Sequence, residues 1–72
     1  MDKMFAFHDY KRTIINLNYF VASELIIDEE EYVFEIKLAL ISKEGRVDLT
    51  LSFDDIEIIS DDYERLIDVL LY

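Results

Sequence analysis

The sequence has 72 residues, no cysteine and a net charge of −10, from 17 acidic and 7 basic residues. This length allows a single domain over residues 1–72, and the absence of cysteine excludes a disulfide scaffold and thiol chemistry. So acidic a chain repels nucleic-acid phosphates and anionic membranes, so we expect it to bind neither directly.

No export or membrane signal is visible in the sequence. The apolar run within residues 1–12 is too short for a signal peptide and has charges on both sides. No apolar stretch approaches the ~20 residues that a membrane helix needs. We therefore expect a soluble, cytoplasmic protein, in the host cytoplasm if a phage encodes it.

The first third of the chain is the hardest to interpret. Residues 4–7 fit either a short edge strand or the start of a helix. Residues 13–27 favour a strand, because they are rich in β-branched and aromatic residues and include two asparagines. A helix over the same residues stays as an alternative, with a stripe formed by Ile14, Leu17, Val21 and Leu25.

Residues 32–53 predict a β-hairpin, since apolar residues alternate with polar ones along both of its arms. A turn at residues 44–45, or a four-residue loop over residues 43–46 in the same register, would pair Leu40 with Leu49 and Leu38 with Leu51. A loop at residues 28–31 would add residues 13–27 as a third strand. That register sets Glu24 opposite Glu35, an unfavourable like-charge pair, which a bulge near residues 22–23 would relieve.

A C-terminal helix is predicted from apolar residues at helical spacing, namely Tyr63, Leu66, Ile67, Leu70 and Leu71. Ser60 or Asp61 is the expected N-cap. Residues 56–59 are expected to form a short strand or a turn before it.

The predicted fold is α+β: a three- to four-stranded antiparallel β-meander with a C-terminal amphipathic helix packed on one sheet face. The opposite sheet face, called the back face below, is rich in apolar residues for a solvent-exposed surface. It is expected to be covered by the N-terminal segment or by a second subunit, which would make the protein a homodimer. The apolar interface residues expected there are Phe20, Ile26, Val33 and Ile41.

Catalysis and cofactor binding find little support in the sequence. The single histidine is His8, and nothing in the sequence places a nucleophile near it. We expect His8 to be a surface or edge residue. Gly45 stands alone in a turn, so a phosphate-binding loop is not indicated. The acidic clusters lack the spacing and the mid-loop glycine of calcium sites. We expect a protein without enzymatic activity, bound cofactor or metal.

The strongest functional signal is the distribution of carboxylates. Residues 54–68 hold seven acids and one base, a net charge of −6, around the predicted helix. Together with the loop at residues 28–31 they form the expected contact surface for a protein partner with a basic surface. The residues predicted to bind it are Asp54, Asp55, Glu57, Asp61, Asp62, Glu64, Asp68, Glu29 and Glu30.

In size, acidity and lack of catalytic residues the chain resembles small phage proteins that imitate DNA and block restriction, repair or CRISPR effectors. The leading hypothesis is therefore an inhibitor that binds the nucleic-acid-binding surface of a target protein, a DNA mimic with an anti-CRISPR or similar anti-defence role. One alternative is an oligomeric accessory or structural module that uses the back face. Another is an immunity protein against a basic nuclease toxin.

Overall fold

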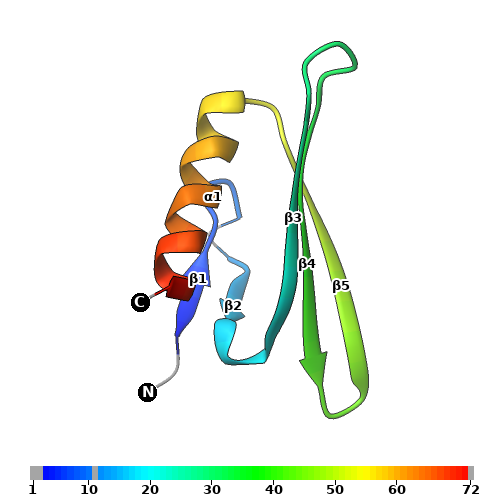
Figure 1. Cartoon of the computed structure of the whole chain (residues 1–72), viewed down its shortest axis with the longest axis vertical. Helices are drawn as coiled ribbons and strands as arrows, with labels where there is room; N and C mark the ends of the chain where they lie inside the picture. The colour runs from blue at the N-terminus through cyan, green and yellow to red at the C-terminus, as the bar shows by residue number, and fades with distance from the viewer. Residues whose placement is uncertain (1–2, 11, 72) are drawn as a thin grey trace.

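The computed structural model describes residues 3–10 and 12–71. Its elements are β1 (Met4–Ala6), β2 (Ile14–Asn16), the 3-10 turn η1 (Leu17–Tyr19), β3 (Phe20–Asp28), β4 (Val33–Ser42), β5 (Gly45–Phe53) and α1 (Ile56–Leu71). β3, β4 and β5 form a three-stranded antiparallel meander, and β1 pairs with β2 in a separate small sheet. The C-terminal helix packs on one side of the meander, which confirms the predicted α+β class (Figure 1).

The β4–β5 hairpin has its predicted faces, but its register differs from the prediction by two residues. Leu38 lies opposite Leu49, and Ser42 lies opposite Gly45, so the turn consists of residues 43–44. Ser42 Oγ stabilises this tight turn by accepting from the Glu44 N–H at 3.2 Å and donating to the Gly45 carbonyl at 3.0 Å. Gly45 has φ +119°, a backbone conformation that residues with a side chain rarely adopt.

The β3–β4 hairpin also differs from its predicted register by two residues. Ile27 pairs with Phe34 and the loop covers residues 29–32, which removes Tyr32 from the strand. Glu24 consequently lies opposite Lys37 instead of Glu35. The like-charge pair expected from the sequence was therefore an error of register, and an opposite-charge pair takes its place.

The segment over residues 13–27 is divided, instead of forming one strand. β2 ends at Asn16, whose side chain accepts from the Asn18 N–H at 2.9 Å and so starts the single turn η1. β3 then begins with a bulge between Phe20 and Ala22. Because a bulge changes which face the preceding residues meet, Phe20 packs against the core. Its predicted position on the back face is wrong.

α1 begins at Ile56, which corrects the expected short strand or turn over residues 56–59 and the expected N-cap. Asp55 is the cap: its Oδ1 accepts from the Glu57 N–H at 2.8 Å and from the Ile58 N–H at 3.4 Å. At the other end, Lys3 Nζ donates to the Val69 carbonyl at 3.1 Å, where a cation suits the helix dipole. No helix within residues 3–10 and 12–71 has the length and hydropathy to cross a membrane.

A single core lies between the meander and the layer formed by α1 and the β1–β2 hairpin. Phe7 and Ile59 are fully buried there against the inward face of β4 and β5. The Phe7 ring meets the rings of Phe5 and Phe53 at centroid distances of 4.8 and 6.2 Å. The N-terminal segment therefore covers the same side as α1, so the expectation that it covers the back face is wrong (Figure 1).

Candidate acidic binding surface

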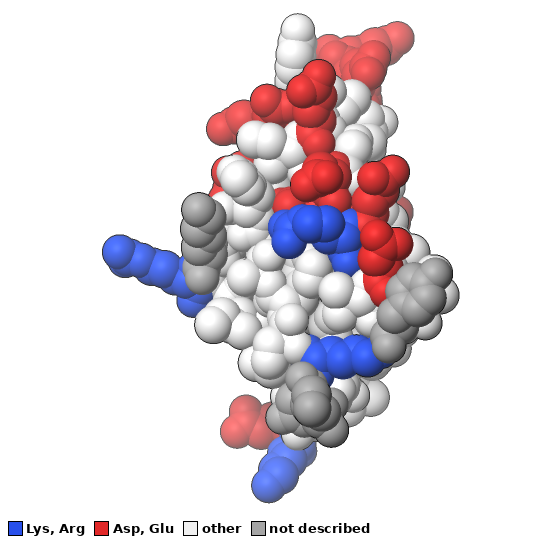
Figure 2. All heavy atoms as spheres, turned by 90° about the vertical axis from the view of Figure 1, so that its left-hand side faces the viewer, with Lys and Arg blue, Asp and Glu red and all other residues white. Residues whose placement is uncertain are grey.

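Four acidic residues of α1 form a row on its exposed face. Glu57, Asp61, Glu64 and Asp68 follow one another at spacings of four, three and four residues, and all four are exposed. With a rise of 1.5 Å per residue, the row extends ~16 Å along the helix, with one carboxylate per ~5 Å. Figure 2 shows acidic side chains concentrated over the upper half of this face. These four residues are called the acidic row below.

The other exposed acids that were predicted to contact a partner lie at the same end of the molecule as the start of α1. Asp54 and Asp55 are exposed immediately before the helix, and Glu29 and Glu30 are exposed in the β3–β4 loop. Figure 1 shows the tip of the β3–β4 hairpin and the start of α1 at one end of the long axis. The fold thus brings two acidic segments, distant in sequence, to one end of the protein.

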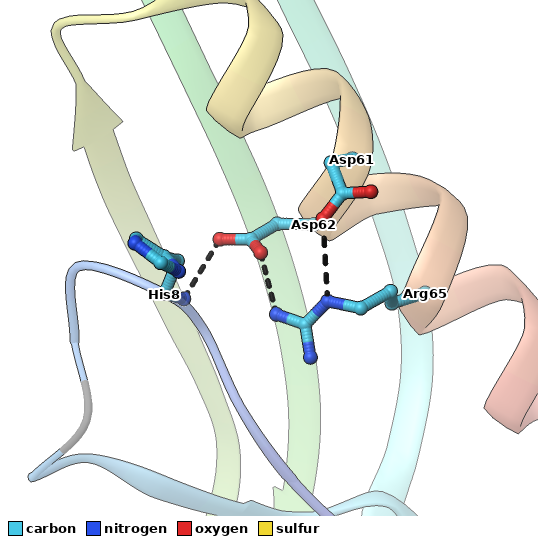
Figure 3. A network of polar contacts seen from close by, with 4 residues as sticks. All are labelled: His8, Asp61, Asp62 and Arg65. Carbon is cyan, nitrogen blue, oxygen red and sulfur yellow. Dashed lines mark hydrogen bonds and ion pairs between the residues drawn. The ribbon is translucent and has the colours of Figure 1, made fainter.

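Asp62 is the one predicted contact residue of the helix that does not reach the surface. Its side chain is 1% exposed. Oδ2 accepts from the His8 backbone N–H at 2.8 Å, and Oδ1 accepts from Arg65 Nη2 (Figure 3). Asp62 therefore joins the N-terminal segment to α1, and its predicted role in partner contact is wrong. His8 contributes its backbone, and the residue itself is exposed as expected.

Arg65 is the only base between residues 54 and 68, and it is directed towards Asp62. Its guanidinium also lies 5.1 Å from the centre of the Phe5 ring. The contact of its Nε with Asp61 Oδ2 is longer, at 3.7 Å, and solvent-exposed, so it neutralises Asp61 weakly. Pairing of Arg65 with buried Asp62 leaves six exposed carboxylates in this segment.

The back face is more polar than the sequence predicted. Ile26 and Val33 are half-buried and Ile41 is 55% exposed, while Phe20 lies on the opposite side of the meander. A shallow hollow of about 430 Å³ occupies this face, and four charged residues contribute to its lining, namely Glu24, Lys37, Arg46 and Asp48. The Arg46–Asp48 ion pair, at 3.0 Å, is exposed at its margin.

Sequence reasoning missed Tyr32, which it placed on a strand facing the core. Tyr32 is 80% exposed in the β3–β4 loop with φ 54°. The predicted loop covered residues 28–31. A loop of the same length over residues 29–32, which the structure has, would have placed Tyr32 outside the strand. Among the described residues, no three His, Cys, Asp or Glu side chains gather closely enough to hold a metal ion. Comparisons with protein-family models, curated proteins and solved structures found no match to this chain.

Proposed function

We propose that this protein is a small, non-enzymatic, cytoplasmic binding protein that occupies a basic, nucleic-acid-binding surface of a target protein. The observation that supports this most directly is the acidic row on α1, because Arg65, the one base within residues 54–68, is paired with buried Asp62. The acids of the β3–β4 loop add negative charge at the end of the molecule where α1 begins. An inhibitor that imitates DNA, such as a phage protein directed against a defence nuclease, would use such a surface.

The spacing of charge supports mimicry in sign and in scale. The acidic row presents one charge per ~5 Å, while one strand of duplex DNA presents one per ~3.4 Å of helix axis. The row lies on a capped helix with a buried inner face, so the backbone that carries these carboxylates needs no further ordering on binding. A basic groove would attract this surface over a distance, which raises the association rate at low salt.

The proposal is tested by comparing three baits in affinity capture from the native host. The first is the wild type, and the second carries Glu57→Gln, Glu64→Gln and Asp68→Asn in the acidic row. The third is a control that removes the same number of charges from the sheet side, through Glu24→Gln, Glu44→Gln and Asp48→Asn.

We expect the wild type and the control to retain the same basic protein, and the row variant to lose it. Retention should fall steeply between about 50 and 200 mM salt, and short duplex DNA should displace the partner. Equal retention by all three baits, or binding that does not respond to salt, would contradict the proposal. An immunity protein against a nuclease toxin would behave alike, and the partner's identity separates the two.

A second candidate, a homo-oligomer formed through the back face, is favoured by one observation. No element within the described residues covers that face, and Ile41 is 55% exposed on it. Light scattering at micromolar concentration tests this version. A dimer that Ile41→Lys abolishes would support it, whereas a strict monomer would exclude it.

A further inference from the structure

Tyr32 has an unusual backbone conformation and an unusually exposed side chain. Its φ of 54° is the only positive value among the described residues other than glycine. Its side chain is 80% exposed, more than any other large hydrophobic residue of the described chain. Bulky residues are rare in the left-handed region, where glycine and asparagine are preferred. The loop would fold more favourably with one of those residues in this position.

The ring of Tyr32 has one aromatic contact with the core beneath it. It meets the Phe34 ring edge-to-face, with centroids 6.4 Å apart, and Phe34 itself is 6% exposed. The loop is also ordered, because Asp28 Oδ1 accepts from the backbone N–H groups of Glu30 and Glu31 at 3.1 and 3.2 Å. Because the backbone of the loop is ordered, it loses little freedom when a partner covers the ring.

The side chains around the ring define the partner chemistry. Glu29, Glu30 and Glu31 are exposed beside Tyr32, so carboxylates and an aromatic ring project from one tip. Guanidinium groups satisfy both features, because they stack on aromatic rings and form bidentate bonds with carboxylates. An ammonium group is strongly hydrated and lacks the planar surface for stacking. The tip therefore matches arginine better than lysine.

We propose that Tyr32 is an anchor residue for the partner and that it selects surfaces rich in arginine over surfaces rich in lysine. This inference rests on the proposed binding function and assigns its specificity to the β3–β4 tip. The acidic row supplies attraction to any cationic surface, and the Tyr32 ring distinguishes which cation is present. Tyrosine is one of the residue types enriched at the few positions that dominate binding energy at interfaces.

The test measures binding of nona-arginine and nona-lysine peptides by isothermal titration calorimetry. The proteins are the wild type, Tyr32→Asn, Tyr32→Phe and the triple variant of the acidic row. Asparagine suits the left-handed backbone, so Tyr32→Asn should melt at or above the wild-type temperature. The wild type and Tyr32→Phe should prefer the arginine peptide by about threefold to fivefold. Tyr32→Asn should lose that preference and bind both peptides alike.

The two proposals fail in different ways. Equal binding of both peptides by the wild type, or an unchanged preference in Tyr32→Asn, would overturn the role of Tyr32. In either case, weaker binding of both peptides by the triple variant of the acidic row would still support the acidic row as a binding surface. A row variant that binds both peptides as well as the wild type would instead contradict the proposed function itself.

Discussion

Replacing Asp62 with alanine should destabilise the protein far more than replacing its neighbour Asp61. Asp62 is 1% exposed and accepts from the His8 N–H at 2.8 Å and from Arg65. It links the N-terminal hairpin, which supplies part of the core, to the middle of α1. Asp61 is 72% exposed and reaches Arg65 only at 3.7 Å. Both substitutions change helix propensity equally, so Asp61→Ala is a matched control.

The expected loss in the free energy of unfolding follows from the hydrogen-bond partners that each substitution leaves unpaired. Loss of the charge-assisted bond to the His8 N–H costs about 1.5–3 kcal/mol. The Arg65 side chain is 46% exposed, so it can turn to water and adds less than ~1 kcal/mol. We expect a loss of ~2–3 kcal/mol for Asp62→Ala and below ~0.5 kcal/mol for Asp61→Ala. A domain of this size has roughly 4–11 kcal/mol of stability in all.

The measurement is urea unfolding followed by circular dichroism, with a thermal scan of each protein. At ~4–8 °C per kcal/mol, Asp62→Ala should lower Tm by roughly 10–20 °C. Hydrogen exchange at the His8 amide should accelerate more than exchange in β4, since the hairpin loses its attachment to α1. Equal midpoints for Asp62→Ala and Asp61→Ala would refute the reasoning.

Three further predictions concern the fold. Asp55→Ala should lower the free energy of unfolding, measured by urea titration, by ~1 kcal/mol because the N-cap is lost. Ser60→Ala, at the cap expected from the sequence, should change it by less than ~0.5 kcal/mol. Raising salt from low concentration to ~0.1 M should increase Tm, because screening weakens repulsion within residues 54–68; an unchanged Tm would indicate that these acids do not repel one another. Phe7→Ala should cost about 3–5 kcal/mol, whereas exposed Met4→Ala should be nearly neutral in the same assay.

The strands and their faces were predictable because their side chains alternate with period two. Phe34, Ile36 and Leu38 face the core as the pattern indicated. The registers were not predictable from alternation alone, since a shift of two residues keeps every side chain on its face. The choice was made by the turns, where Ser42 and Gly45 close one hairpin and Asp28 orders the other.

The start of α1 and the place of the N-terminal segment needed the tertiary structure. Ile56 and Ile59 continue the helical spacing of Tyr63, but β-branched residues also favour a strand. The structure decides for the helix, in which Asp55 is the cap and Ile59 is buried in the core. β1 and β2 are three residues long, too short for any period to be read from them. Their identity as strands depends on pairing with each other and on burial of Phe5 and Phe7.

The candidate surface was partly visible in the sequence. The exposed acids on α1 follow from helical spacing, because polar residues opposite an apolar stripe face water. Asp62 lies on the inward side, and only its bonds to His8 and Arg65 explain why a carboxylate is tolerated there. Tyr32 was misplaced because its position depends on the register of β3 and β4.

Composition and periodicity by themselves determined the class of fold, the faces of the meander and the acidity of one end of the chain. These are local properties, set by the spacing and charge of neighbouring residues. Register, helix length and the place of each N-terminal residue depend on contacts between segments far apart in sequence. The tertiary structure alone therefore decided that Asp62 of the helix is buried and that Tyr32 is exposed at the β3–β4 tip, beside the acids of that loop.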